Sequence, residues 1–143
     1  MAMYQPSKYY NPEIQVAAMK RRYPQFHDVK KKKGEIDFTG IIKVSLVLPA
    51  YTIVVTYRGD LRPLVRVVSP VLVPDRPHFH EVNNSLCLYH PKNFNWTRDK
   101  LVAQYIISWA AAWIYFYEVW LVSKIWYGPE ADHKDELLKL ETI

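Results

Sequence analysis

Cysteine and glycine are scarce in this sequence of 143 residues, which holds one cysteine and four glycines. The single cysteine, Cys87, cannot form a disulfide within the chain, and this favours a reducing compartment. So few glycines leave no phosphate-binding loop and no glycine-rich nucleophile elbow. Residues 1–12 also lack the apolar core, preceded by basic residues, of a secretory signal. We therefore expect a cytoplasmic protein.

A strong excess of charge of one sign is absent as well. The 19 Lys and Arg residues against 14 Asp and Glu residues give a net charge of +5. This mild excess falls short of a nucleic-acid coat, so we expect no nucleic-acid partner. Four lysines, Lys30 to Lys33, stand in a row. Like charges resist packing, which favours an exposed loop over a contact site for an acidic partner.

One long apolar run, residues 101–122, has the length of a membrane-spanning helix. Gln104, Ser108 and Glu118 interrupt it, and a glutamate in mid-span costs about 2 kcal/mol or more. Its tryptophans and tyrosines run through the middle instead of gathering at the ends. We therefore expect a helix of a soluble protein and no membrane contact.

Half of the residues are hydrophobic and 23% are charged, a composition that can bury a core without disulfides. The length fits one domain, so we expect a single domain over residues 1–143 in which residues 1–10 form a loose arm.

The pattern predicts a first helix and then strands. Asn11 as cap, with Pro12 and Glu13, is typical of a helix start, and Pro24 predicts an end near Tyr23. Within this helix, four residues fall at helical spacing: Ile14, Ala17, Ala18 and Arg21. Alternating apolar residues predict three strands in an antiparallel meander, at 36–48 with a possible bulge at Gly40, at 51–57, and at 64–68 before Pro70.

The second half predicts a long irregular segment followed by helices. Residues 70–96 hold four prolines, three histidines and the cysteine, and irregular segments of this length in a compact domain are usually functional. Thr97 is a candidate cap for a helix that ends at Gly128-Pro129, and 132–140 fits a short terminal helix. The long helix carries an aromatic stripe that we interpret as core packing against the sheet: Trp109, Trp113, Phe116 and Trp120. The fold class is therefore α+β.

Cys87 has two interpretations from its surroundings. Its thiolate can act as a nucleophile that carries an acyl group, or the side chain can be a small buried hydrophobe between Leu86 and Leu88. Nearby histidines would allow a Cys-His pair or a zinc site. The spacing of the candidate ligands matches no common zinc pattern: His78, His80, His90 and Cys87.

Several short segments, taken together and in order, carry a resemblance to a known family. They are MKRRYPQF at 19–26, YTIVVTY at 51–57, PLVRVVSP at 63–70, His78 with NSLCLY at 84–89, Trp96, the helix residues Trp109, Trp113, Glu118 and Trp120, and WYGPEADH at 126–133. The chain resembles bacterial ubiquitin-conjugating enzymes, and at this size it is similar to the stand-alone conjugating protein of short type II CBASS anti-phage operons.

The resemblance implies a UBC-like fold with an N-terminal helix, an antiparallel meander, a long active-site loop and C-terminal helices. It also implies a transferase of bacterial antiviral defence that forms a thioester between Cys87 and the C-terminus of a cGAS/DncV-like nucleotidyltransferase. No adenylating domain fits in 143 residues, so the resemblance implies transfer of an acyl group that is activated elsewhere or by an unusual route. No cofactor and no metal is implied. The alternative is a non-catalytic binding module with the same fold.

The resemblance also assigns candidate roles around Cys87. His78 would hold the loop, and His80 or His133 would shift the thiol toward thiolate. Eukaryotic members of the family carry His-Pro-Asn ahead of the cysteine, with the asparagine stabilising the oxyanion, whereas this chain has His78-Phe79-His80. Asn84, or Asn83 beside it, is the candidate for that amide. Tyr89 stands where many members carry aspartate.

Overall fold

A computed structural model describes residues 12–129 of the chain. In chain order its elements are α1 (Pro12–Arg22), β1 (His27–Lys30), the 3-10 helix η1 (Lys32–Gly34), β2 (Ile36–Ile42), β3 (Tyr51–Arg58), β4 (Leu61–Ser69), β5 (Phe79–His80), β6 (Ser85–Leu86) and α2 (Val102–Ser123). The predicted arm at 1–10, the cap at Asn11, the terminal helix at 132–140 and His133 lie outside the described residues.

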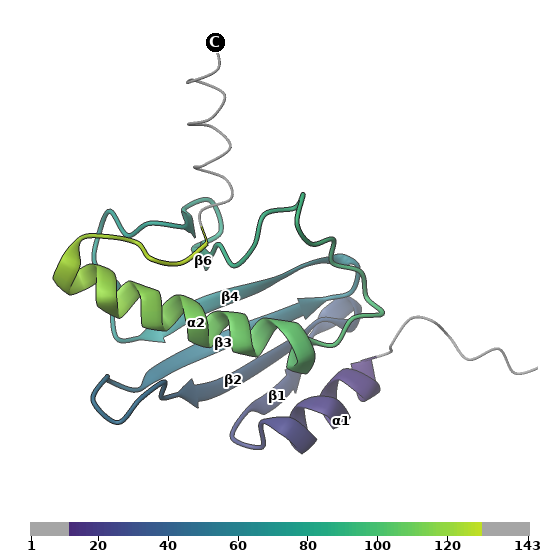
Figure 1. The fold of residues 1–143 in the computed structure, drawn as a ribbon. Coiled ribbons are helices and arrows are strands. Elements are labelled where there is room, and N and C mark those ends of the chain that lie inside the picture. The colour runs from purple at the N-terminus through teal and green to yellow at the C-terminus, as the bar shows by residue number, and fades with distance from the viewer. Residues whose placement is uncertain (1–11, 130–143) are drawn as a thin grey trace, which may run out of the picture.

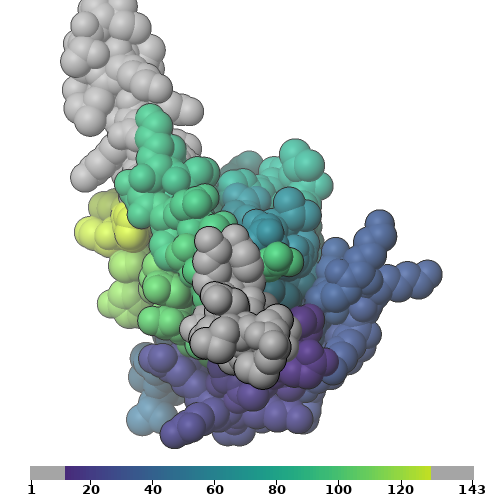
Figure 2. All heavy atoms as spheres, turned by 90° about the vertical axis from the view of Figure 1, so that its right-hand side faces the viewer, coloured from purple at the N-terminus to yellow at the C-terminus, as the bar shows by residue number. Residues whose placement is uncertain are grey.

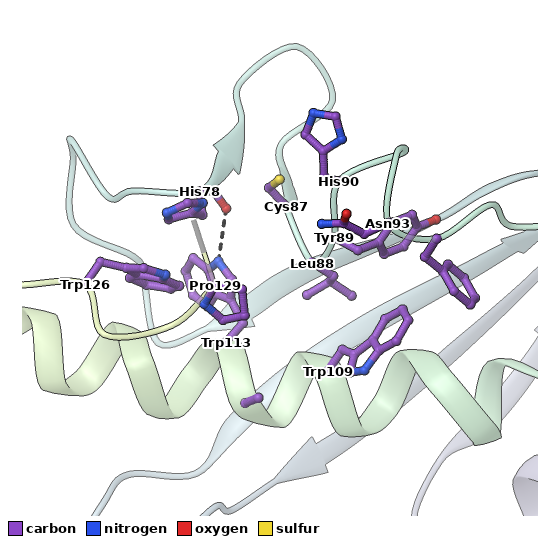
Figure 3. Close-up of a pocket in the computed structure, with 12 residues that line it drawn as sticks. His78, Cys87, Leu88, Tyr89, His90, Asn93, Trp109, Trp113, Trp126 and Pro129 are labelled. Atoms are coloured by element: carbon purple, nitrogen blue, oxygen red, sulfur yellow. Dashed lines mark hydrogen bonds between the residues drawn. The ribbon is translucent and has the colours of Figure 1, made fainter. Parts of the chain in front are cut away.

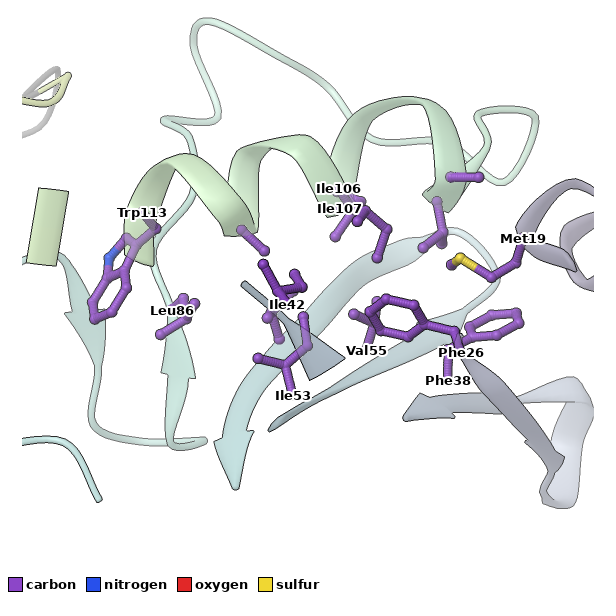
Figure 4. Packing of buried hydrophobic residues seen from close by; sticks show 14 of the residues in the cluster. Met19, Phe26, Phe38, Ile42, Ile53, Val55, Leu86, Ile106, Ile107 and Trp113 are labelled. Atoms are coloured by element: carbon purple, nitrogen blue, oxygen red, sulfur yellow. The ribbon is translucent and has the colours of Figure 1, made fainter. Parts of the chain in front are cut away.

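Strands β1 to β4 form one antiparallel sheet in sequence order, and α2 lies across one face of it (Figure 1). The predicted α+β class and meander are therefore confirmed. The alternation in β3 is real: Tyr51, Ile53, Val55 and Tyr57 point into the core and are at most 2% exposed. Figure 4 shows Ile106 and Ile107 of α2 above Ile53 and Val55 of the sheet.

Strand β2 ends at Ile42, so the prediction that it runs to residue 48 is wrong. Ile42 pairs with Tyr51 and closes the β2–β3 hairpin, which leaves residues 43–50 as the connection. There the Ser45 hydroxyl accepts hydrogen bonds from the backbone N–H groups of Val47 and Leu48, at 3.3 and 3.2 Å. Leu46 is 94% exposed. The alternation of apolar residues in the sequence thus continues beyond the end of β2, into a turn whose residues pair with none of the described strands.

Gly40 marks a close contact and no bulge. It pairs in regular register with Ile53. A Cβ atom at Gly40 would stand 2.6 Å from the ring of Phe26, closer than real Cβ contacts come. Glycine is needed there because an aromatic ring packs directly against the strand. Close approach of another group is, besides a bulge, a common reason for a glycine inside a strand.

The sheet also has a strand that the sequence pattern did not predict. β1 pairs with β2 at the edge of the sheet, and most of its residues are exposed, so it shows no apolar alternation. Lys30 belongs to β1 and lies 2.8 Å from the Glu13 carboxylate. The other three lysines of the run are exposed as expected, and the blue segment around η1 stands out from the body in Figure 2.

Helix α1 ends near Tyr23 as predicted, but its buried residues are Gln15 and Met19, whereas Ile14 is 42% exposed. Gln15 Nε2 donates to the carbonyl of Lys100 at 2.8 Å, and Gln15 Oε1 accepts from the N–H of Val102 at 3.0 Å. One of the N–H groups in the first turn of α2 that lack a partner within the helix is therefore satisfied by a side chain from α1. The predicted cap at Thr97 is wrong, because α2 begins only at Val102.

Helix α2 ends at Ser123, where Lys124 adopts a left-handed conformation, so the predicted end at Gly128-Pro129 is also wrong. Its face toward the sheet is made of smaller residues than the aromatic stripe: Val102, Ala103, Ile106, Ile107, Ala110 and Ile114, with Trp113 and Tyr117. Of the stripe, only Trp113 is buried. Trp109 and Phe116 instead contact aromatic rings outside the sheet, those of Phe94 and Trp126.

Among residues 12–129, α2 is the one helix whose length and composition would allow it to cross a membrane. Eight of its apolar residues are buried in the protein core, which accounts for the apolar character of the helix. Glu118, the charge within the run, accepts a hydrogen bond from the hydroxyl of buried Tyr51. Burial and this carboxylate raise the pKa of Tyr51 above its ordinary value. The features of α2 are thus those of a helix packed on a sheet.

Candidate functional site

Cys87 follows β6, and its backbone is held by one carbonyl group. The carbonyl oxygen of His78 accepts a hydrogen bond from the N–H of Cys87 at 2.8 Å and another from Nε1 of Trp113 at 3.0 Å. His78 itself has φ of 53°, a left-handed conformation that costs free energy in a non-glycine residue. These two hydrogen bonds tie the cysteine to the β5–β6 hairpin and to α2 at the same point.

A pocket of about 320 Å³ opens beside Cys87, between the irregular segment and α2 (Figure 3). In the figure, Cys87, His90 and Asn93 lie on the side away from the helix, and Leu88, Trp109 and Trp113 lie toward it. The described residues that line it are His78, Cys87, Leu88, Tyr89, His90, Asn93, Phe94, Trp109, Ala112, Trp113, Trp126 and Pro129. The cysteine thus stands on the polar rim of an aromatic pocket.

Electrostatics at Cys87 act in opposite directions. Burial of the half-buried side chain raises the pKa of the Cys87 thiol, and the nearby Arg62 guanidinium lowers it, with burial the larger effect. At neutral pH the resting thiol is therefore protonated. Arg62 is thus a positive charge that acts on the cysteine.

His80 does not supply a positive charge to Cys87. Arg62 Nη1 lies 3.1 Å from His80 Nε2. Because a guanidinium can only donate, Nε2 of His80 is the acceptor and carries no proton. Burial, with the Arg62 charge adding to it, lowers the pKa of His80. The His80 ring thus accepts a hydrogen bond from Arg62, which lies on β4.

The predicted site residues separate in space. His78 and Cys87 line the pocket together. His80 lies on β5 against Arg62, and Asn84 is exposed at the β5–β6 turn with φ of 56°, outside the pocket lining. The fifth candidate, His133, lies beyond the described residues.

Two polar residues of the rim, His90 and Asn93, were not predicted as site residues. Nδ1 of His90 accepts a hydrogen bond from the N–H of Lys92 at 2.9 Å, so the neutral ring carries its proton on Nε2. The His90 carbonyl accepts from the N–H of Asn93 at 2.9 Å. These bonds form a tight turn over residues 90–93, which contains Pro91, and both side chains line the same pocket as Cys87. The His-Pro-Lys sequence is the signal that could have indicated this turn.

Tyr89 and Trp126 complete the walls. The Tyr89 ring packs against Phe94 and Trp109, with ring centres 5.0 and 5.4 Å away. Burial raises the pKa of Tyr89 to about 12, although Arg62 and Arg58 oppose the shift. Trp126 lies after α2 and packs on His78, with ring centres 4.8 Å apart. Segments far apart in the sequence therefore build one site.

The cysteine and histidines do not form a metal centre in this part of the molecule. Within residues 12–129, no group of three or more His, Cys, Asp or Glu side chains is placed to hold a metal ion. The candidate ligands have other contacts. His80 contacts Arg62, and Nδ1 of His90 accepts a hydrogen bond from the N–H of Lys92. The arrangement suits a thiol at the mouth of an apolar pocket.

Comparison with known proteins gives one informative match. The family model described as Type II CBASS E2 protein matches residues 15–134, and no curated protein matches the chain. The matched span includes Cys87, Arg62 and every residue that lines the pocket. The resemblance to the conjugating protein of type II CBASS is thereby confirmed, and its role in antiviral defence follows at the level of the family. This chain belongs to the Type II CBASS E2 protein family.

Proposed function

We propose that Cys87 accepts the C-terminal acyl group of a partner protein as a thioester. The observation that carries this proposal is the position of Cys87 on the rim of a pocket, with its backbone fixed by the His78 carbonyl. A nucleophile held in place avoids part of the entropy cost of bringing two reactants together. Membership of an E2 family supports conjugation as the reaction class. The proposed catalyst is a cysteine-dependent acyl transferase on a UBC-like fold.

The reaction needs an activated donor, either an acyl adenylate or a thioester, supplied by another protein. The Cys87 thiol gives its proton to solvent water, and the thiolate attacks the carbonyl carbon of the donor. A C–S bond forms and the carbonyl electrons move to oxygen. The bond to the leaving group then breaks, so that AMP or a thiolate departs and the acyl group remains on Cys87. Charge and atoms balance without a metal or cofactor.

Arg62 and an asparagine are the groups proposed to stabilise charge in this reaction. Arg62 opposes the effect of burial on the pKa of Cys87 and so favours the thiolate. The amide that would donate to the oxyanion belongs to Asn93, which lines the pocket, or to Asn84 at the β5–β6 turn. His78 is proposed to hold the loop through its carbonyl, and His133 to act on the thiol. Single alanine variants separate the two asparagines.

The partner proposed for Cys87 is the C-terminus of a cGAS/DncV-like nucleotidyltransferase, in the cytoplasm. The family places the chain in type II CBASS, which requires a protein partner of that system. The acyl attachment would regulate signalling by the nucleotidyltransferase. The proposed unit of function is the single domain formed by the whole chain.

A non-catalytic scaffold is the second candidate, and one observation favours it. Burial raises the pKa of the Cys87 thiol, which lowers the share of reactive thiolate at neutral pH. A scaffold would bind the same partner through the pocket without forming a covalent bond.

Intact mass after co-expression with the nucleotidyltransferase in the native host, where the protein that activates the C-terminus is present, separates the two candidates. Acyl transfer predicts a covalent adduct at Cys87 that neutral hydroxylamine removes and that is absent from Cys87→Ala. Cys87→Ser, which keeps the size of the side chain, should give a hydroxylamine-resistant ester or no adduct. A stable complex without any adduct would establish the scaffold. A Cys87→Ala chain that fails to fold would instead show that the cysteine is a core residue.

A further inference from the structure

We propose that the aromatic pocket beside Cys87 selects the acyl donor by binding an apolar side chain from one of its last two residues. This inference rests on the proposed acyl transfer and adds a substrate specificity to it. Cys87 is itself part of the lining, so an acyl group on its sulfur has its first residues at the pocket mouth.

The chemistry of the pocket differs between rim and floor. His90 and Asn93 lie with Cys87 on the side away from α2, where they can hydrogen-bond a peptide backbone (Figure 3). Leu88, Trp109 and Trp113 form the side toward the helix. A donor tail laid along the rim would therefore turn a side chain toward apolar surface, which gains free energy by leaving water.

The lining also defines what the pocket excludes. Among residues 12–129 the lining contains no lysine, arginine, aspartate or glutamate, so a charged side chain would lose its hydration without gaining a partner from these residues. A volume of about 320 Å³ lies at the lower end of the range for ligand pockets, about 300–1,000 Å³. It suits one large side chain and a short piece of backbone. Leucine, methionine and phenylalanine fit this description, and glycine leaves the floor empty.

The walls are fixed well enough to discriminate. Trp113 is held by its hydrogen bond to the His78 carbonyl. Trp109 is packed among the rings of Phe94, Tyr89 and Tyr105, with ring centres 4.8 to 5.8 Å away. A pocket whose walls are already packed does not collapse onto a small side chain, so the lost contact shows directly in the rate.

Ala112 allows the pocket to be filled without changing the core. It lies on α2, lines the pocket and is exposed to solvent. A phenylalanine at this position would occupy the space of the donor side chain. Ser108 is also exposed on α2 but lies outside the lining, so Ser108→Phe adds the same ring to the same helix as a matched control.

The test measures transfer to Cys87 from three short peptide thioesters with one leaving group, ending in Gly-Gly, Leu-Gly or Gly-Leu. We expect a kcat/KM at least about tenfold higher for one leucine peptide than for Gly-Gly. Ala112→Phe should abolish that preference and Ser108→Phe should retain it, with far-UV circular dichroism unchanged in both. Titration of Cys87→Ala with the corresponding peptide amides, followed by tryptophan fluorescence, should give the same order of affinity.

The outcomes distinguish this inference from the proposed function. Equal rates for all three peptides would overturn the pocket specificity while leaving acyl transfer intact. A leucine preference that survives in Ala112→Phe would place the selecting site elsewhere and overturn the inference. No transfer from any peptide, together with a leucine preference in the fluorescence titration, would overturn acyl transfer and keep the pocket as a binding site.

Discussion

The sheet with α2 and the segment that carries Cys87 are stabilised in different ways. In the sheet, many apolar side chains are buried together, and Ile36, Phe38, Tyr51, Ile53 and Val55 are all completely buried. Around Cys87, most side chains are half-buried, and a few hydrogen bonds set the backbone. A core distributes its stability over many contacts, whereas the site depends on single ones. Changes in the two regions should therefore have different consequences.

The largest effect is expected in the core. Ile53→Ala removes a side chain that is completely buried between the sheet and α2, and such truncations cost about 2–5 kcal/mol of the free energy of unfolding. Ile53→Val at the same position should cost about 1 kcal/mol. The urea midpoint of both variants measures this. If the two variants had equal midpoints near that of the wild type, the core would be far looser than the structure shows.

A single polar residue that joins α1 to the start of α2 comes next. Gln15→Ala leaves the carbonyl of Lys100 and the N–H of Val102 without their partner at the start of α2, which should cost about 2 kcal/mol. Gln104→Ala makes the same chemical change on the exposed face of α2 and should cost less than about 0.5 kcal/mol. Equal unfolding free energies for the two variants would contradict the role given to Gln15.

A smaller effect is expected where the chain folds back after α2. A Cβ at Gly128 would lie 2.6 Å from the Phe116 ring and 2.8 Å from Nε1 of Trp126. Gly128→Ala should therefore displace Trp126 and cost about 1 kcal/mol. The change should appear at the pocket, as altered tryptophan fluorescence, with the sheet intact by far-UV circular dichroism. Unchanged fluorescence would show that the pocket wall does not depend on this packing.

The smallest effect concerns the reactivity of Cys87. The Arg62 cation lowers the pKa of the thiol, so Arg62→Gln should raise that pKa and slow alkylation at neutral pH about threefold. The curve of alkylation rate against pH should also shift to higher pH, because a thiol with a higher pKa needs a higher pH to give the same share of thiolate. Arg66→Gln removes a positive charge from the same strand, where the side chain bonds Thr56 instead. An equal shift in both variants would indicate a general charge effect and contradict a specific role for Arg62.

The sequence pattern predicted those elements whose buried residues recur at a regular spacing or whose ends follow a local rule. The alternation from Tyr51 to Tyr57 and the end of α1 near Tyr23, just before Pro24, were confirmed because each rests on a local rule. β1 was missed because an exposed edge strand has no apolar period. The strand was extended to residue 48 because Leu46 and Leu48 keep the alternation while Ser45 organises a turn.

The site was predicted in part for a related reason. Cys87 and His78 were identified through their segment, and the structure brings both to one pocket. Arg62 could not be identified, because it lies on β4 and reaches the cysteine only in the folded chain. Likewise, the contribution of His78 that the structure shows is its carbonyl, a group that every residue has. Contacts between distant segments, and contacts through the backbone, leave little trace in residue types.

The central claim is tested most directly by comparing two reactions of Cys87, in the folded chain and in a free peptide with the sequence of residues 83–92. Iodoacetamide should label the folded chain more slowly than the peptide, because burial raises the pKa of the thiol. Transfer from a peptide thioester should instead be faster to the folded chain, because the pocket holds the donor beside the sulfur. Slower reaction of the folded chain with both reagents would contradict acyl transfer and establish the scaffold.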